Sequence, residues 1–295
     1  MFLLSYNDIA SCEPNKNELN IIPEKSNFRF AFYILPKEKR NAIINIYTLC
    51  SYLDNIVDDS SNNLNEIKIK KERLEWWKYK IHKIYTNNIV SDNSKFTLEF
   101  KKIIKRFNIP EDYFNILIDG IAKDLIIKQY INFEQLLDYC YGVASIVGLI
   151  CTCIFDDTTK ISKNYAINLG YALQLTNIIR DIYLDSERNY IYIPQDDLIK
   201  CNFSKEDIIN KNYNENFVKL AKIQYSRAIF YYNKAENCLK EMTKEVQKKF
   251  KSAEIMKNIY FELLNKIQEK QFNIFGKKIK LSTPEKLFIT LKTIL

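Results

Sequence analysis

Apolar residues recur at intervals of three and four along most of the chain, the spacing that places them on one face of an α-helix. After Pro36 this pattern sets Arg40, Tyr47 and Asp54 along one face of a helix predicted over Lys37–Asp59. Further helices are predicted around Leu74, Trp77 and Ile81, and over about 94–107, Pro110–Lys128, Phe133–Phe155, Ile161–Asp185, 204–211, 213–243, 246–270 and from Pro284 onward.

Residues 1–25 lack this periodicity, are mostly polar and contain Pro14 and Pro23, so we expect a flexible N-terminal arm. Asn189–Pro194 is an aromatic turn that interrupts the helical pattern. No linker or shift in composition divides residues 26–295. Five glycines and six prolines are too few for many short strands joined by tight turns. The prediction is one all-α domain after the arm.

Composition excludes several classes of site. One histidine, His82, is too few for sites built from several imidazoles. No two glycines lie within five residues of each other, so the common phosphate-binding glycine loops are absent. The seven scattered cysteines indicate reduced thiols and a cytoplasmic protein. The apolar run Val143–Phe155 has 13 residues, short of the roughly 20 that span a bilayer, so it is expected to be a core helix.

The net charge of +8 favours anionic partners such as phosphorylated metabolites or acidic lipid surfaces. A lysine-coated soluble surface is the alternative explanation. Because no nucleic-acid motif is present, nucleic acid is not an expected partner. The sequence identifies no protein partner.

The chain has two pairs of aspartates four residues apart, Asp54 with Asp58 and Asp181 with Asp185, and both lie inside predicted helices. Each pair projects from one helix face about one turn apart, close enough to share a hard cation. Their flanks are apolar, and buried carboxylates need cationic partners. Two solvated acidic faces are the alternative interpretation.

The second pair belongs to a longer polar stripe. Gln174, Asn177, Asp181 and Asp185 share one helix face, and Arg180 lies beside it as a candidate phosphate ligand. If the two helices face each other, they form a cradle for magnesium ions and a diphosphate. Magnesium held by both pairs would let an allylic carbon–oxygen bond ionise without a protein nucleophile. The 20 tyrosines and 18 phenylalanines can surround the resulting carbocation.

The chain resembles the squalene/phytoene synthase family over nearly its whole length. The C-terminal stretch from Ile259 and the Trp76–Trp77 pair look most like bacterial presqualene diphosphate synthases. The segments that carry the family resemblance are Phe28–Phe32, Leu35–Pro36, Lys39–Arg40, Ile46–Asp59, Leu117–Leu125, Tyr139–Leu149, Leu169–Asp185 and Ile191–Pro194.

The resemblance implies the isoprenoid synthase helical bundle with a central cavity, and head-to-head (1'-2-3) condensation of two prenyl diphosphates. It identifies Asp54, Asp58, Asn177, Asp181 and Asp185 as ligands of several Mg²⁺ ions and of diphosphate. Asp119 and Asp124 match a further motif. The other positions that it assigns to catalysis or substrate binding are Tyr47, Arg180, Phe28, Arg40, Gln174, Tyr192, Tyr260 and Lys278.

The expected substrate is farnesyl diphosphate and the expected product presqualene diphosphate, made without NADPH. Phytoene synthesis from geranylgeranyl diphosphate is the alternative. Chain length depends on cavity depth, for which the candidate residues are Phe28, Phe30, Ala144 and Gly148. We expect a cytoplasmic enzyme that touches the inner face of the membrane where its product leaves.

The chain departs from the family pattern at Ser51, Asn55, Tyr190 and Lys278, where relatives commonly carry arginine or, at position 55, an acid. Each lost charge-assisted hydrogen bond is worth roughly 1.5–3 kcal/mol. Nearby cations are therefore needed to compensate, and the candidates are Lys37, Arg40 and Lys123. The alternative, from another functional class, is a folded but inactive family member that acts as a scaffold.

Overall fold

A computed structural model describes residues 28–58, 64–86 and 95–295. Within these ranges the chain is built from helices, without a β-strand, so the all-α prediction is confirmed. The predicted arm, residues 1–25, lies outside the described residues. The helices of the first half are α2 (Phe28–Phe32), α3 (Lys37–Asp58), α4 (Leu64–Tyr85), α5 (Lys95–Phe107), α6 (Glu111–Ala122), η2 (Lys123–Leu125), α7 (Phe133–Cys140), η3 (Tyr141–Ser145) and α8 (Ile146–Ile154).

The second half begins with the longest helix, which Thr159 caps by accepting a hydrogen bond from the backbone N–H of Ser162. Asn189 takes a left-handed conformation just after this helix, with φ of 63°, and so ends it. The helices of this half are α9 (Lys160–Glu187), α10 (Gln195–Lys200), α11 (Lys205–Ile209), α12 (Glu215–Glu241), α13 (Lys244–Lys249), α14 (Lys251–Glu269) and α15 (Thr283–Ile294).

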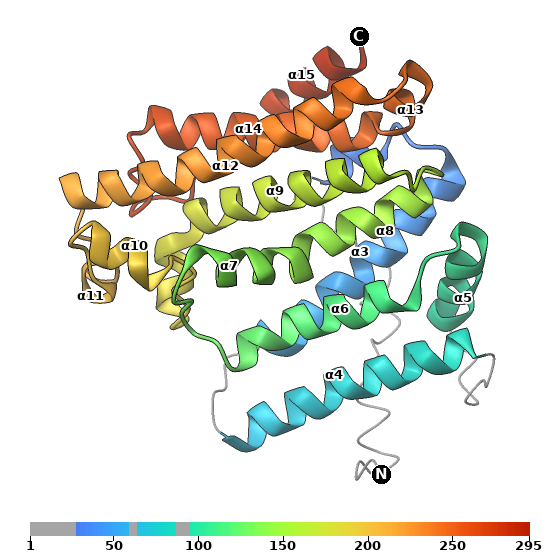
Figure 1. The fold of residues 1–295 in the computed structure, drawn as a ribbon, viewed down its shortest axis with the longest axis horizontal. Helices are drawn as coiled ribbons and strands as arrows, with labels where there is room; N and C mark the ends of the chain where they lie inside the picture. The colour runs from blue at the N-terminus through green and yellow to red at the C-terminus, as the bar shows by residue number, and fades with distance from the viewer. Residues whose placement is uncertain (1–27, 59–63, 87–94) are drawn as a thin grey trace.

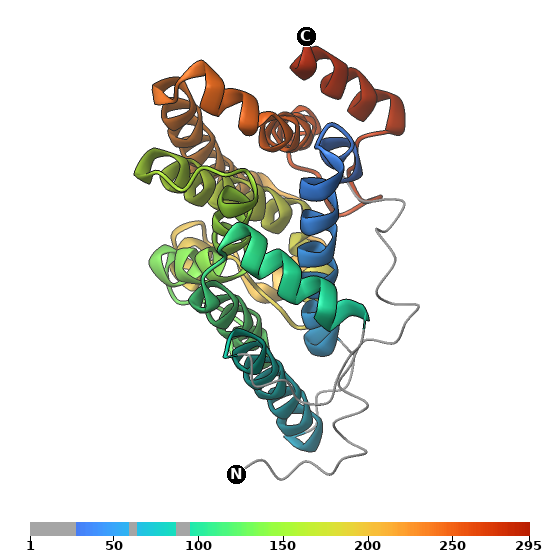
Figure 2. The same cartoon turned by 90° about the vertical axis from the view of Figure 1, so that its right-hand side faces the viewer.

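The long helices form a row in the order α4, α6, α7 to α8, α9 and α12, with neighbours side by side (Figure 1). The view turned by 90° shows α3 running across one side of this row (Figure 2). Helix α14 packs on α9, and α15 packs on α14 and α2. Helix α9 therefore lies at the centre of the fold and packs against neighbouring helices on several sides.

Two helix boundaries differ from the sequence prediction, and one helix was not predicted. The helix predicted to reach Lys128 ends at Ala122, because the following segment pairs with the aromatic turn: the backbone N–H of Ile191 donates to the carbonyl of Lys128 at 2.8 Å. The helix predicted over 246–270 is broken at Phe250, whose side chain is buried between α13 and α14. Helix α10 was not predicted.

The stretch between α7 and α8 is a π-helical turn, η3, which is one wide turn within an otherwise α-helical rod. Its Gly142 touches the backbone of Gly120 on α6, and its Ser145 touches Gly170 on α9. Neither contact leaves room for a larger residue, so these glycines allow three helices to approach closely.

The rod Phe133–Ile154 is 22 residues long, and its most apolar 18-residue window has a mean hydropathy of 1.7, so the rod is long and apolar enough to cross a membrane by length and composition. The 13-residue run Val143–Phe155 covers only its C-terminal part. In the fold this rod packs between α6 and α9, and several of its side chains line an internal cavity. This position is that of a core helix.

Candidate active site

A cavity of about 330 Å³ lies between α3, the η3–α8 segment, α9 and α14. Along α9 its walls extend from Tyr165 to Asn177, which corresponds to about 18 Å of helix. Asp54, Gln174 and Asn177 line it at one end. The remaining walls are mainly apolar, so the cavity joins a polar end to an apolar end.

Three carboxylates gather beside the polar end: Asp54 and Asp58 near the end of α3, and Asp124 on η2. The Asp54 side chain is exposed to solvent at this end, yet the protein packed closely around it raises its pKa to about 7, with further contributions from the charges of Asp58 and Asp124. Burial likewise raises the pKa of Asp124 to about 7, although Tyr139 donates a hydrogen bond to Asp124 Oδ2 at 2.8 Å. The cluster therefore carries less negative charge than its composition suggests.

The second carboxylate pair, on α9, is held by cations. Asp181 accepts hydrogen bonds from the guanidinium of Arg180, and its Oδ1 lies 3.0 Å from Lys278 Nζ. Burial would raise the pKa of Asp181, but these two partners outweigh burial and lower it. At Asp185, burial and the charge of Asp181 raise the pKa to about 7. The two members of the pair thus differ in charge state near neutral pH.

The two sides of the site meet through a cation and a tyrosine stack. Arg188, just after α9, lies 3.4 Å from Asp58 at the end of α3. Tyr130, Tyr139, Tyr192 and Tyr190 form a run of neighbouring rings, with centroids 5.2–5.9 Å apart at each step. These rings present several π faces beside the carboxylates, a surface that attracts cations.

Most predicted site residues are brought together. Tyr47, Asp54, Gln174, Asn177 and Tyr260 line the cavity, as do the candidate depth residues Ala144 and Gly148. Asp185 and Tyr192 line a small crevice next to it, and Lys278 and Arg180 contact Asp181. Their roles as ligands stay predictions.

Other predicted residues are not at this site. Arg40 is 14 positions before Asp54 on α3, a separation of about 21 Å along the helix. Asp119 pairs with Lys78 at 2.5 Å on the exposed side of α6. Phe30 packs against the core without lining the cavity. The side chain of Phe28 lies outside the described residues.

The cations expected to compensate for the missing arginines do not lie beside the paired carboxylates. Lys123 is paired with Asp138, and Lys37 begins α3 at the end far from Asp54. The cations found there are Lys128, whose Nζ lies 3.9 Å from the ring centre of Tyr190, and Arg188, which lies beside Asp58.

The donor atoms at the polar end suit a hard divalent cation such as Mg²⁺, because they are all carboxylate or amide oxygens. Asn177 Oδ1 and Asp124 Oδ1 are buried without a hydrogen-bond partner. An unpaired buried oxygen is costly, and a cation or an ordered water would relieve that cost. In the part of the chain that the structure describes, no three acidic, cysteine or histidine side chains already form a metal site. These oxygen atoms are of the chemical kind that the ion prefers, but they would have to move closer to one another to bind it.

A larger hollow, about 970 Å³, lies on the outer face of α12. It is lined by Phe133, Lys222, Arg227 and Phe230 among others, and none of the carboxylates described above belongs to it. We assign the chemistry to the smaller cavity because Asp54, Gln174 and Asn177 line one end of it and its other walls are mainly apolar.

Comparisons with known proteins agree with this geometry. A sequence profile described as "Squalene/phytoene synthase" matches residues 23–285. A 15-cis-phytoene synthase of Synechocystis sp. is 29% identical over 272 residues, which cover 88% of this chain and 78% of that protein. A chloroplastic phytoene synthase of an Oncidium hybrid cultivar is also 29% identical over 266 residues, 88% of this chain, but the match spans only 62% of its length.

Solved structures show the same fold. A dehydrosqualene synthase superposes with a TM-score of 0.81 at 24% identity, covering 98% of this chain and 95% of that one. The squalene synthase HpnC from Alicyclobacillus acidocaldarius superposes with a TM-score of 0.75 at 18% identity, covering 90% and 95%. At these identities the likeness establishes the fold.

Proposed function

Because this chain belongs to the squalene/phytoene synthase family, whose members are prenyltransferases, we propose that it joins two prenyl diphosphates head to head. One observation carries the proposal: Asp54, Gln174 and Asn177 line one end of a mainly apolar cavity, with Asp58 and Asp124 close to Asp54 and with Asp181 and Asp185 one and two turns beyond Asn177 on α9. This arrangement suits a substrate with an anionic head and a hydrocarbon chain.

The polar end would bind the diphosphate. Arg180 and Lys278 both contact Asp181, and each has further N–H groups that can donate hydrogen bonds to phosphate oxygens. Asp54, Asp58, Asn177, Asp181 and Asp185 would hold Mg²⁺, which when bound neutralises the negative charge of a diphosphate leaving group.

The rest of the cavity would protect the reacting carbons. Heterolysis of the allylic carbon–oxygen bond leaves a carbocation that water would quench, and the apolar walls exclude water. The rings of Tyr47 and Tyr260 line the cavity, and stacked tyrosines flank the carboxylates. These faces stabilise positive charge without a nucleophile. That heterolysis releases the diphosphate of the first substrate. The cation then adds to the double bond of the second substrate, and closure of the cyclopropane ring releases one proton, while the second diphosphate stays on the product.

We propose presqualene diphosphate, formed from two farnesyl diphosphates without NADPH, as the product. Phytoene from geranylgeranyl diphosphate is a second candidate, because the curated relatives described above are named phytoene synthases. A scaffold without activity is less well supported, since all four paired aspartates remain and cations occupy the site.

The test is to incubate purified protein with Mg²⁺ and either farnesyl or geranylgeranyl diphosphate, with and without NADPH, and to identify the lipid by mass spectrometry. We expect presqualene diphosphate from farnesyl diphosphate alone. Phytoene or squalene would correct the product. If the protein neither consumes nor binds either substrate, the proposed enzymatic activity is contradicted and the scaffold is favoured.

We also propose that this cytoplasmic enzyme touches a membrane through α15. Leu287, Phe288, Leu291, Ile294 and Leu295 are 44–103% exposed and recur at the spacing of one helix face. Such a stripe lies flat in the interface of a bilayer when basic residues flank it.

Basic residues do flank the stripe. Lys280 is close enough to Lys286 for its charge to lower the pKa of Lys286 further, after the larger effect of burial. Lys292 is exposed on the same helix. Together with the net charge of +8, these lysines suit anionic lipid headgroups.

Replacing Phe288 and Leu291 together with serine should weaken binding to anionic phosphatidylglycerol vesicles at least about tenfold, because two apolar side chains no longer enter the lipid. Co-sedimentation with vesicles measures this. Ile199→Ser is the matched control, since Ile199 is 66% exposed on α10 and lies outside the stripe. Equal binding by both variants would contradict the membrane contact, as would absence of binding by the wild type.

A further inference from the structure

The apolar end of the cavity is closed by three aromatic rings. Tyr165 and Phe250 meet edge to face with ring centres 5.5 Å apart, and Phe155 meets Phe250 at 5.2 Å. All three line the cavity. Tyr165 is 1% exposed and is the lining residue of α9 that is farthest from the carboxylates.

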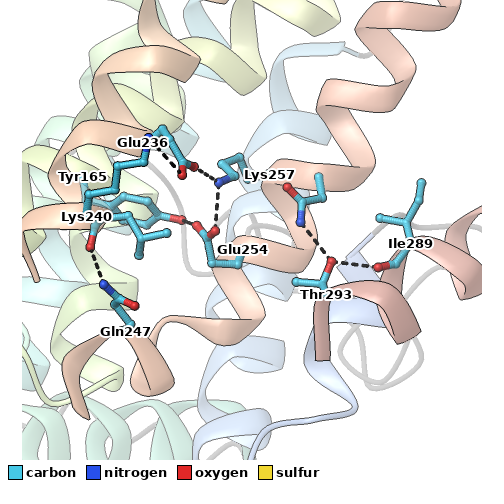
Figure 3. Close-up of polar contacts among 10 residues, drawn as sticks. Tyr165, Glu236, Lys240, Gln247, Glu254, Lys257, Ile289 and Thr293 are labelled. Carbon is cyan, nitrogen blue, oxygen red and sulfur yellow. Dashed lines mark hydrogen bonds and ion pairs between the residues drawn. The ribbon is translucent and has the colours of Figure 1, made fainter. Parts of the chain in front are cut away.

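The hydroxyl of Tyr165 points out of the cavity into a buried ionic network (Figure 3). It donates a hydrogen bond to Glu254 on α14. Glu254 in turn accepts from Lys257 Nζ at 2.8 Å, and Lys257 also pairs with Glu236 on α12. The side chains of Glu254 and Lys257 are only 13% and 11% exposed. One phenol thus joins three helices behind the cavity wall.

This network fixes the ring in place. If the ring of Tyr165 turned away, a buried hydroxyl would lose its partner, and Glu254 would lose one of its hydrogen bonds. Buried polar networks with every member paired are rigid for this reason. The other aromatic residues of the closed end, Phe155 and Phe250, have no such anchor, since their side chains carry no polar atom.

We propose that Tyr165 is the residue that limits the length of the prenyl chain, with Glu254 and Lys257 as the positioning residues that hold its ring. The inference rests on the proposed function. A chain too long for the cavity would have to displace the ring and would then meet buried charges, a surface that hydrocarbon does not tolerate. Ala144 and Gly148 also line the cavity, and Gly148 packs against Ala166, the neighbour of Tyr165 on α9.

The experiment compares binding and turnover of a shorter and a longer substrate. Affinities of farnesyl and geranylgeranyl thiodiphosphate, which resist ionisation, are measured by calorimetry with Mg²⁺. Product formation from the two natural diphosphates in competition is measured by mass spectrometry. Tyr165→Ala should shift both ratios toward the longer chain by about tenfold or more, the discrimination that a few methylene groups provide.

Three variants separate specificity from stability. Tyr165→Phe keeps the ring and should preserve the preference for the shorter chain while lowering the melting temperature, because Glu254 loses a donor. Tyr165→Val is a second truncation in case alanine unfolds the protein. Tyr171→Ala removes a tyrosine of the same helix that packs on Tyr231 and does not line the cavity, and it should leave both ratios unchanged.

Each outcome is informative. Unchanged ratios in folded Tyr165→Ala or Tyr165→Val would overturn the inference and leave the proposed function intact. A wild type that binds both thiodiphosphates but forms no product would contradict the proposed function, while the affinity ratio would still test Tyr165. A wild type that binds neither would overturn both.

Discussion

Replacing Asp54 with asparagine is expected to lower the rate of diphosphate release by about a hundred- to a thousandfold, the usual effect of removing one preorganised electrostatic contact. Asparagine keeps the shape of the side chain but loses the charge that would help to hold Mg²⁺ beside Asp58 and Asp124. The rate is measured with saturating prenyl diphosphate and Mg²⁺. Asp119→Asn is the matched control, because Asp119 pairs with Lys78 away from the cavity.

The same substitution should stabilise the metal-free protein. The pKa of Asp54 rises from 3.8 to about 7 in the fold, so the folded state binds a proton more tightly than the unfolded chain does. The ionised carboxylate therefore destabilises the fold most above pH 7, and this penalty shrinks as the pH falls from 7 toward 4. Thermal unfolding without divalent cations should show Asp54→Asn above the wild type at pH 8, with a smaller difference at pH 6.

Mg²⁺ should reverse that order. A cation that binds the ionised carboxylates stabilises the wild type more at pH 8 than at pH 6, because protons compete with it. Asp54→Asn should gain less from Mg²⁺ at both pH values. An asparagine variant that keeps full activity and full stabilisation by Mg²⁺ would sink the assignment of Asp54 as a ligand.

Gly120→Ala is expected to destabilise the fold by about 1–3 kcal/mol, the usual cost of forcing extra atoms into a packed interior. In an ordinary helix the same change stabilises the fold by about 1 kcal/mol. A loss of stability would therefore show by its sign that the added methyl group does not fit. A Cβ atom on Gly120 would lie 2.6 Å from the carbonyl carbon of Gly142, where only backbone is present and nothing can rotate aside. Urea unfolding measures the change.

The control for this prediction is Gly276→Ala. A Cβ atom on Gly276 would meet no atom within 4 Å, and its φ is not positive. Its free energy of unfolding should stay within about 0.5 kcal/mol of the wild type. If Gly120→Ala proves as stable as the control, α6 and η3 must be able to separate without cost.

Local spacing was enough to predict most of the helices and the helical pairing of the four aspartates. The 3.6-residue period fixes which side chains share a face, and that period is a property of sequence neighbours. The period does not say how far apart along the helix two side chains of the same face lie. Arg40 and Asp54 share a face of α3, as the pattern predicted, but they lie about 21 Å apart along it, so Arg40 does not reach the site to which the resemblance assigned it.

The contacts that the sequence could not predict join segments that are distant in the chain. Asp124 joins the carboxylates because α6 ends at Ala122, and the next segment pairs with the turn at Ile191. Tyr165 had the spacing of any buried helix residue, and only the packing of α9 against α14 sets its hydroxyl on Glu254. The family resemblance named Asp124, but it did not name Glu254 as the partner of Tyr165, because a resemblance identifies positions and not contacts.

The π-helical turn at η3 fixes the phase of two helices in one rod. One residue fewer in Tyr141–Ser145 would make the rod continuously α-helical and would turn α7 by about 100° relative to α8. Tyr139 would then swing off Asp124, while Val147 and Cys151 kept their places on the cavity wall. The length of this turn, rather than the identity of any side chain in it, therefore aligns the tyrosine stack with the carboxylates.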